Sequence, residues 1–498
     1  MSLLKTELAQ WRAHPLRELL AGAVATFALI PEVIAFSFVA GVDPQVGLFA
    51  SFVLSIVIAV FGGRPAMITA AAGSVALVAA PLVSQHGLPY LLAAGMLAGA
   101  VQVVFGALRM GVLMRFVSSS VRTGFVNALA ILIFSAQLPH LADANLVTWG
   151  MLAAGLAIIY GVPKLPIPGA QSIPSPLICI VVLSGLSVVL QLPVSTVADL
   201  GQLPSALPQW LGWPPVPMEL ETLRIIAMPA LAIAMVGLLE SMMTARVVDE
   251  LTDTPSSKNR ECAGLGVANI AASCFGGIAG CGMIGQTVGN VKYGGRGRLS
   301  TLFAGVFLLI LMVLLKPWVG QVPVVALVAI MVMVSVSTFD WRSVGALARH
   351  PRLSGVVMLA TVAVTLGTHN LAAGVGVGVL LSGVFFALKV AGLMRVERSE
   401  AADGSLRYAV SGQVFFASAD AFIDAFDPRQ AQGRTVVIEL AQARLWDITA
   451  VAALDKVIER FGHHGVRVRV HGLDRHSRGL LKRVRRHGDA ALEDSAGA

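Results

Sequence analysis

Two short stretches rich in small residues decide how this chain can fold. Residues 66–73 read AMITAAAG, and residues 282–289 read GMIGQTVG. Both contain Met-Ile with a Gly five residues after the Ile, at an offset of 216 residues. Glycine and alanine let an extended backbone approach a neighbour closely. The two stretches therefore predict a matching pair of elements, each an extended segment followed by a short helix.

The rest of the chain is unusually apolar. Of its 498 residues, 56% are hydrophobic and 13% are charged, whereas a soluble domain carries roughly 25% charged residues. Residues 1–395 hold 21 Lys+Arg and 14 Asp+Glu, and residues 396–498 hold 15 and 14. A bilayer is therefore the expected solvent of residues 1–395, and residues 396–498 are expected to form a small soluble domain.

The apolar part divides into segments of membrane-spanning length, about 20 residues each. Twelve ordinary spans are expected near residues 18–41, 44–62, 89–108, 122–138, 146–162, 173–192, 223–245, 260–278, 299–316, 322–339, 353–370 and 372–392. The two stretches rich in small residues extend to 66–85 and 280–294 and are read as broken spans. The total is fourteen transmembrane segments.

The basic residues set the orientation of these segments, because cytoplasmic loops carry an excess of Lys and Arg. With the N-terminus inside, 19 of the 21 basic residues in this part are cytoplasmic, and only Arg224 and Lys316 lie outside. The same bias explains the net charge of +8 without nucleic-acid binding. We expect a multi-pass protein of a bacterial inner membrane, with lipid as a partner and with a cytoplasmic N-terminus and C-terminal domain.

Fourteen segments can form two halves of seven spans each. Because seven is odd, the second half must begin on the opposite side of the membrane from the first. This predicts an inverted repeat, with repeats at about 15–193 and 222–393. Half-helices that start at mid-membrane present free N–H groups and a positive dipole end. Two such starts facing each other make an anion site without a lysine. The alternative is that the small residues only allow close helix packing.

Two acidic residues, Glu32 and Glu240, lie well inside predicted spans at an offset of 208. A charge at that depth costs several kcal/mol, so such residues mark ion pathways or proton relays. Neither has an obvious Lys or Arg partner in the spans, and burial without a cation favours the protonated carboxyl. We expect both to take part in coupling to protons. The alternative role is a protonated side chain in a structural hydrogen bond.

Several motifs resemble those of one transporter family. Residues 30–36 read IPEVIAF and residues 40–49 read AGVDPQVGLF; residues 237–241 read GLLES, residues 264–270 GLGVANI and residues 275–277 FGG. Together they resemble the SulP, or sulfate-permease, family of anion transporters over almost the whole chain.

The resemblance implies an all-α polytopic protein with a core and a gate domain, functioning as a homodimer. It also implies an anion between the half-helices, against the first and eighth spans. The implied binding residues are Glu32, Phe36, Ala71, Ala72, Gly73, Glu240, Gly285, Gln286 and Thr287. Many members carry Ser-Arg-Ser/Thr where this chain has Gly285-Gln286-Thr287. The missing fixed charge favours co-transport with a cation, either a proton or Na⁺.

The C-terminal domain resembles STAS domains, which follow the membrane part in this family. Residues 411–416, 435–440 and 466–470 read as strands, and residues 449–461 as an amphipathic helix. This order predicts a small α/β domain. Residues 447–450, DITA, fall where STAS regulators carry Asp-Ser-Ser-Gly. Thr449 is therefore a candidate for phosphorylation, although a helix cap is the favoured role.

The expected function is proton-coupled symport of small carboxylates, such as the C4-dicarboxylate fumarate, or of sulfate or bicarbonate. A Na⁺-coupled bicarbonate symporter and an anion exchanger of the same fold remain open. So do a nucleobase transporter and a regulator acting through its STAS domain. The histidines and the four cysteines show neither catalytic nor metal-ligand spacing. We therefore expect no enzyme activity, no cofactor and no metal.

Overall fold

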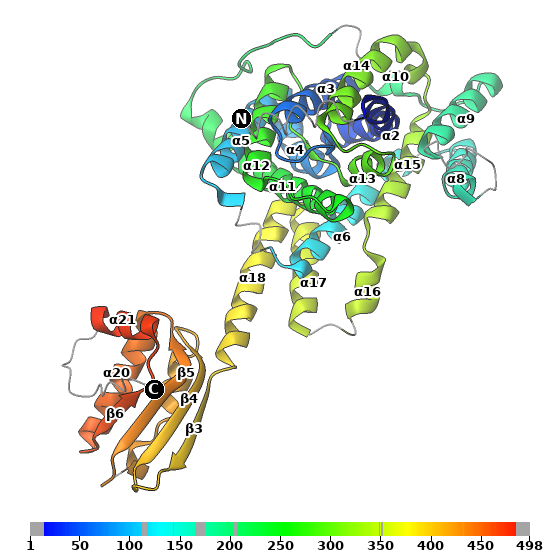
Figure 1. Ribbon diagram of the computed structural model, residues 1–498. Helices are drawn as coiled ribbons and strands as arrows, with labels where there is room; N and C mark the ends of the chain where they lie inside the picture. The colour runs from blue at the N-terminus through cyan, green and yellow to red at the C-terminus, as the bar shows by residue number, and fades with distance from the viewer. Residues whose placement is uncertain are drawn as a thin grey trace. The chain divides into compact units, whose positions relative to one another are not determined.

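The structure is a computed structural model that describes residues 14–111, 117–142, 144–164, 175–203, 207–347, 349, 352–431 and 433–484. Its contacts divide the chain into two compact units, Met1–Val379 and Leu380–Ala498. Figure 1 draws a helical first unit and a second unit that combines a sheet with helices. The two units differ in architecture.

Each of the fourteen expected segments contains a helix. These are α2 (Pro15–Ala40), α3 (Pro44–Phe61), α4 (Gly73–His86), α5 (Leu88–Ala107), α6 (Ser119–Ser135), α8 (Leu146–Gly161), α9 (Ser175–Leu190), α11 (Leu220–Thr252), α12 (Lys258–Cys274), α13 (Ile284–Lys292), α14 (Arg298–Gly320), α15 (Val324–Thr338), α17 (Arg352–Thr368) and α18 (Leu371–Ala391). Short helices α7 (Pro139–Ala142), α10 (Val197–Leu200) and α16 (Trp341–Leu347) lie between them.

Length and hydropathy separate these helices into classes. Within the described residues, nine helices are long and apolar enough to cross a membrane, and α9 and α17 are shorter apolar helices. The remaining segments are α4, α12 and α13. At 1.5 Å per residue, α4 and α13 are about 21 Å and 14 Å long, less than the ~30 Å hydrocarbon core. The count of fourteen crossings stays a prediction.

The two stretches rich in small residues fold as expected, each as a short strand followed by a short helix. Strand β1 (Thr69–Ala70) precedes α4, and strand β2 (Cys281–Gly282) precedes α13. The strands pair antiparallel, with Thr69 opposite Gly282 and Ala70 opposite Cys281. Two segments more than 200 residues apart in the chain therefore meet through backbone hydrogen bonds.

The Met-Ile alignment of the two stretches is wrong by several residues. Ile68 lies before β1, whereas Ile284 is the first residue of α13. Thr69 and Cys281, which begin the two strands, are 212 positions apart, and the two helix starts are 211 apart. The two elements correspond at the boundary between strand and helix. The shared Met-Ile pair does not mark that boundary.

Helix contacts in the first unit come in matching pairs, seven segments apart. The first segment, α2, packs against α14, α13 and α4, and the eighth, α11, packs against α5, α4 and α13. Similarly, α6 packs against α17, and its counterpart α15 packs against α8. A seven-plus-seven repeat would give such matching pairs, and the inverted repeat itself stays a prediction.

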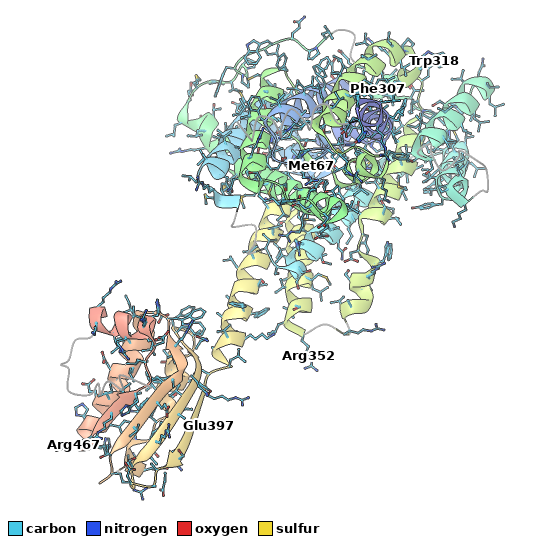
Figure 2. All side chains as sticks on the ribbon, viewed as in Figure 1. Met67, Phe307, Trp318, Arg352, Glu397 and Arg467 are labelled. Atoms are coloured by element: carbon cyan, nitrogen blue, oxygen red, sulfur yellow. The ribbon has the colours of Figure 1, made fainter. Side chains whose placement is uncertain are left out.

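The same contacts separate two groups of helices. α2, α3, α4, α5, α11, α12, α13 and α14 form a group around β1 and β2, while α6, α8, α9, α15 and α17 pack largely with one another. Phe307 of α14, labelled in Figure 2, packs against Phe27 of α2 and Phe303. That these two groups act as a core and a gate stays a prediction.

The second unit contains a four-stranded sheet of β3 (Arg395–Glu400), β4 (Leu406–Val414), β5 (Val436–Leu445) and β6 (Val468–His471), in that order. β3 is antiparallel to β4, and β4, β5 and β6 are parallel. Helices α19 (Ala419–Asp424), α20 (Ile448–His463) and α21 (Arg475–Val484) complete the unit. Tyr408, Phe422 and Phe461 are buried in its core.

The three strands and the helix expected in this unit are present, with shifted ends. β4 begins and ends earlier than residues 411–416, and β5 continues to Leu445. β3 escaped detection because most of its side chains are exposed, so its hydrophobic pattern is weak. α18 ends at Ala391 and β3 begins at Arg395. The domain boundary near residue 395 stays a prediction, because α18 continues past the division between the units.

Candidate functional site

The pairing of β1 with β2 brings the starts of two half-helices to one region of the first unit. Both α4 and α13 contact α2 and α11. In the described part of the chain, no acceptor is found for the first three N–H groups of either half-helix. These belong to Gly73, Ser74 and Val75 in α4, and to Ile284, Gly285 and Gln286 in α13. Free N–H groups at a helix start can bind an anion.

The two helix starts differ in how open they are. A Cβ added to Gly73 would lie 2.6 Å from Cε1 of Phe36, whose ring is buried. A Cβ added to Gly285 would meet no atom within 4 Å. Phe36 therefore covers the start of α4, while the start of α13 borders free space. Gly73 is needed for this close approach, and Gly285 is not sterically required.

The carboxylate of Glu240 connects the two broken segments. It accepts a hydrogen bond from Oγ of Ser74, the second residue of α4, and another from Sγ of Cys281 on β2, at 3.1 Å. Ser74 and Cys281 are fully buried, and Glu240 is half-buried. Glu240 of α11 thus lies at the start of α4.

Glu32 has the corresponding relation to the other half-helix. Its carboxyl group lies near the side chain of Gln286, the third residue of α13, and close enough to Glu240 for the two charges to interact. Pro31, directly before it, lies inside α2. The structure therefore brings together the two acids that the sequence singles out.

The other expected binding residues line the same region, but some of their polar groups have partners. Oγ1 of Thr287 accepts the N–H of Ile68 at 2.9 Å, and the N–H of Ala71 donates to Oγ of Ser51 at 3.1 Å. Ala72 is the buried residue directly before α4. Thr287 and Ala71 therefore hold the strand crossing together. That they contact an anion stays a prediction.

Sequence reasoning missed Ser74 and Cys281. A hydroxyl directly after Gly73, in the first turn of a predicted half-helix, was a usable signal for Ser74. Cys281 shows no catalytic or metal-ligand spacing in the sequence, and all four cysteines are buried. No sequence signal tells which cysteine contacts Glu240, because that depends on the register of β2 against β1.

An amide network supports β2 from behind. Asn269 of α12 accepts the N–H of Gly280 at 2.8 Å, and its amide donates to the carbonyl of Gly280 at 3.3 Å and to Gln102 of α5 at 2.8 Å. Gln102 in turn donates to the carbonyl of Ala234 in α11. Asn269 belongs to the GLGVANI motif, so this motif positions the strand that carries Cys281.

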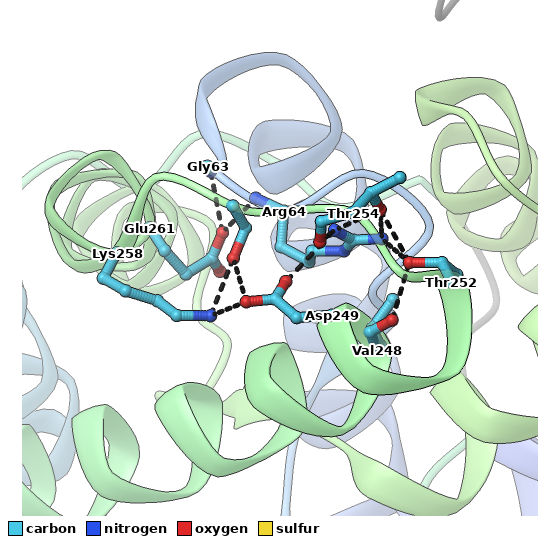
Figure 3. Close-up of polar contacts among 9 residues, drawn as sticks. Gly63, Arg64, Val248, Asp249, Thr252, Thr254, Lys258 and Glu261 are labelled. Carbon is cyan, nitrogen blue, oxygen red and sulfur yellow. Dashed lines mark hydrogen bonds and ion pairs between the residues drawn. The ribbon is translucent and has the colours of Figure 1, made fainter.

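A second polar network holds the residues that lead into β1 (Figure 3). The buried guanidinium of Arg64 makes five hydrogen bonds, to Asp249, Thr252 and Thr254 at the end of α11. Asp249 also pairs with Lys258 at 2.5 Å. The carboxylate of Glu261 accepts the N–H groups of residues 63 and 64, at 2.7 and 2.9 Å. The network ties the entry of β1 to α11 and α12.

The favoured capping role of Thr449 is wrong. The N-cap of α20 is Asp447, whose carboxylate accepts the N–H groups of Ala450 and Phe416, each at 2.9 Å. Thr449 is exposed in the first turn, where its side chain is not at the capping position. Its phosphorylation stays a prediction. In the described ranges, no group of three or more His, Cys, Asp or Glu side chains is placed to hold a metal ion.

Comparison with known proteins matches both units to described families. The sulfate permease family model matches residues 16–148 and 140–361, and the STAS domain model matches residues 397–487. The protein of Bacillus subtilis (strain 168) described as "Putative sulfate transporter YbaR" is 48% identical over 476 residues, covering 95% of this chain and 98% of that protein. The bicarbonate transporter BicA of Picosynechococcus sp. is 24% identical, with 88% and 80% covered.

Solved structures show the same fold. Murine Solute Carrier 26 family member A9, an anion transporter in the inward-facing state, aligns with a TM-score of 0.81 at 17% identity, covering 95% of this chain and 88% of that chain. The transmembrane domain of a cyanobacterial bicarbonate transporter, BicA, gives a TM-score of 0.63 at 24% identity, covering 74% and 98%. The chain therefore belongs to the sulfate permease family, a family of membrane transporters and not of enzymes, and it carries a STAS domain.

Proposed function

We propose that this chain is a proton-coupled symporter of small anions, with small carboxylates such as fumarate as the preferred substrates. Sulfate and bicarbonate are the alternative substrates, and the relatives named for them support anion transport in general. The observation that carries the coupling is the placement of Glu32 and Glu240 at the two half-helix starts. Each can take up a proton beside a site that favours negative charge.

The chemistry of Gln286 supports a mobile cation. Many relatives carry an arginine at this position, as the resemblance implies, whereas Gln286 supplies only an uncharged amide near Glu32. A proton bound by a carboxyl group removes one negative charge from the site, and so partly replaces the absent guanidinium. We assign the anion to the region between α4 and α13, against Glu32 and Glu240, bordered by the open space at Gly285.

Uptake into proteoliposomes tests this function. The full chain is reconstituted, and labelled fumarate, sulfate and bicarbonate are offered with and without an inward proton gradient while the membrane potential is clamped. We expect accumulation of fumarate that follows the proton gradient and is lost in Glu240→Ala. Uptake of an anion that ignores the gradient contradicts proton coupling. Absence of uptake for all three anions contradicts the function.

Two variations of the assay separate the alternatives of the same fold. A sodium gradient that drives uptake where a proton gradient fails identifies Na⁺ as the coupling ion. Uptake that requires an anion inside the vesicle identifies an exchanger. A thermal-shift screen that compares nucleobases with anions tests the alternative of a nucleobase transporter. The STAS match at residues 397–487 disfavours that alternative.

The placement of the protein is part of the proposal. We propose that it lies in the bacterial inner membrane as a homodimer, with its N-terminus and STAS domain in the cytoplasm. The distribution of Lys and Arg supports this orientation. A role through the STAS domain alone predicts that Glu240→Ala leaves the cellular phenotype intact while deletion of residues 396–498 abolishes it.

A further inference from the structure

The exposed apolar side chains of the STAS domain gather in one place. Among the described residues after α18, the large hydrophobic side chains that are exposed are those of Leu393, Phe416, Trp446 and Ile448. The ring of Phe415 joins two of them, with its centroid 5.2 Å from that of Phe416 and 6.0 Å from that of Trp446. We call Phe416, Trp446 and Ile448 the aromatic patch. A cluster of exposed apolar side chains marks a contact with a membrane or a protein.

The register of the sheet places the aromatic patch at the end of the domain where the chain arrives from α18. The first residue of β3, Arg395, lies opposite Ser411 of β4, and the two strands are antiparallel. The chain before β3 and the chain after β4 therefore extend to the same end. Val414 of β4 lies opposite Leu445 in the parallel strand β5. The aromatic patch follows directly after both of these residues.

The link between α18 and the sheet is short. α18 has 21 residues and is apolar enough to cross a membrane, and at about 32 Å it just covers the ~30 Å hydrocarbon core. Only residues 392–394 separate it from β3, and they span at most about 11 Å. When α18 crosses the membrane, the end of the domain that carries the aromatic patch is therefore held close to the lipid headgroups.

Basic side chains lie at the same end of the domain. The N–H of Leu445 donates to Oγ of Ser477 at 3.0 Å, which places the first turn of α21 beside the end of β5. The basic residues gathered there and along the link are the exposed Lys389, Arg395, Arg444 and Arg475 and the half-buried Arg478. Arginine and lysine near an anionic membrane surface are attracted to its headgroups.

The acidic side chains at this end are fewer, and two of them have partners within the domain. Asp447 accepts the N–H groups of Ala450 and Phe416. Asp474 accepts the N–H of Ser477 at 2.8 Å and pairs with Arg444 at 3.3 Å. The third, Asp420, is exposed in the first turn of α19. Five basic and three acidic residues leave a net charge of about +2 around the aromatic patch.

We propose that the aromatic patch and the basic residues around it dock the STAS domain onto the anionic lipid surface of the cytoplasmic leaflet. Trp and Phe carry large apolar rings that suit the boundary between headgroups and acyl chains. The guanidinium groups of Arg444 and Arg475 suit the lipid phosphates around them. This docking goes beyond the proposed function, because it concerns where the domain rests and neither the anion nor its coupling ion.

Fluorescence from the full chain in nanodiscs tests the docking. An environment-sensitive fluorophore is attached to Thr449→Cys, beside the aromatic patch, while the native cysteines are buried. The nanodiscs contain phosphatidylcholine alone or an equal mixture with phosphatidylglycerol, and some lipids carry a quenching nitroxide on the headgroup. We expect a blue shift and quenching in the mixture, less of both in phosphatidylcholine, and a decrease when salt is raised.

A label at the other end of the sheet is the matched control. Ala402 is exposed in the turn between β3 and β4. The ten residues of β5 separate this end from the aromatic patch, a distance of about 30 Å. We expect the same fluorophore on Ala402→Cys to show neither quenching nor a blue shift in either lipid.

Substitutions separate the apolar and the electrostatic parts of the docking. Phe416→Ser should reduce quenching of the Thr449→Cys label in both lipids. Arg475→Gln should lower the ratio of docked to free domain about fivefold in the mixture and leave it unchanged in phosphatidylcholine. Arg467→Gln is the control, because Arg467 (labelled in Figure 2) is exposed at the other end of the sheet, directly before β6. Unchanged hydrogen exchange over α20 verifies that each variant is folded.

Two outcomes overturn the docking. A Thr449→Cys label that remains in water in both lipids shows that the aromatic patch is uncovered. A label that is shielded but not quenched by the nitroxide lipids, with no dependence on phosphatidylglycerol, shows that a protein surface, such as a second copy of this chain, covers it. These measurements involve no transported anion. Their failure therefore leaves the proposed function intact, and absence of uptake in proteoliposomes leaves the docking intact.

Discussion

Gly73 and Gly285 occupy comparable positions in the first turns of the two half-helices, yet their surroundings differ. A Cβ on Gly73 would lie 2.6 Å from the ring of Phe36, while a Cβ on Gly285 would meet nothing within 4 Å. The difference follows from Phe36, which covers only the start of α4. At the scale of single residues, the starts of α4 and α13 are therefore asymmetric.

Substitution of these glycines by alanine tests that asymmetry. Gly73→Ala forces the buried ring of Phe36 to move, and overpacking of this kind costs about 1–3 kcal/mol. Gly285→Ala adds a methyl group to free space and should leave stability within about 0.5 kcal/mol. We expect a lowered Tm in detergent for Gly73→Ala only. Equal Tm values for both variants would contradict the contact between Phe36 and α4.

Asp447 and Thr449 give a second matched pair, in the STAS domain. Asp447→Ala removes the cap of α20 and leaves the N–H groups of Ala450 and Phe416 without their acceptor. Loss of such a cap costs about 1 kcal/mol. We expect faster amide hydrogen exchange over α20 in the full chain, with no change in Thr449→Ala. Faster exchange in Thr449→Ala instead would restore Thr449 as the capping residue.

At the scale of elements, the strand crossing is held by contacts that arrive from several helices. Asn269 and Gln102 hold the residue before β2, Thr287 holds the residue before β1, and Arg64 holds the entry to β1. The short strands themselves supply few hydrogen bonds. Their position therefore depends on buried side chains of α5, α11, α12 and α13.

The Arg64 network is the most testable of these supports. Arg64→Met keeps the bulk of the side chain but removes all five hydrogen bonds of the guanidinium and the ion pair with Asp249. Breaking a buried pair costs about 3–5 kcal/mol. Asp249 keeps Lys258 as a partner, so we expect the lower end of that range, measured as faster hydrogen exchange over residues 249–261.

The control for Arg64 is a more exposed ion pair. Arg407 pairs with Glu439 in the second unit, and its side chain is 49% exposed, compared with 4% for Arg64. Exposed pairs contribute about 0–1 kcal/mol, so Arg407→Met should change exchange little. Equal effects of the two substitutions would show that the Arg64 network does not anchor the entry to β1.

At the scale of the whole molecule, the distribution of Lys and Arg predicts how the chain is oriented in the membrane. The four native cysteines are buried. A thiol reagent should therefore label an introduced exposed cysteine with little labelling of the native ones. Gln209 lies between the seventh and eighth expected spans, which the expected orientation places outside, and Ala402 lies in the STAS domain; both are exposed. In intact cells, a membrane-impermeant maleimide should label Gln209→Cys, and should label Ala402→Cys only after permeabilisation. The reverse pattern would overturn the orientation.

Much of the architecture is predictable because the hydropathy of a segment depends only on the residues of that segment. All fourteen apolar segments contain helices, and both stretches rich in small residues become strand and half-helix. The exposed strand β3 was missed because its sequence lacks a buried face. The Met-Ile alignment failed because a two-residue echo says nothing of where a helix begins.

The sequence by itself determined the apolar segments, the two broken ones, the two acids within them and the STAS-like tail, since each depends on composition and spacing along the chain. Only the tertiary structure decided which groups those acids meet. That Ser74 and Cys281 approach Glu240, while Gln286 approaches Glu32, depends on the register of β1 against β2 and on the rotation of α2 and α11. Those are set by packing between residues some 200 positions apart, which no local pattern encodes.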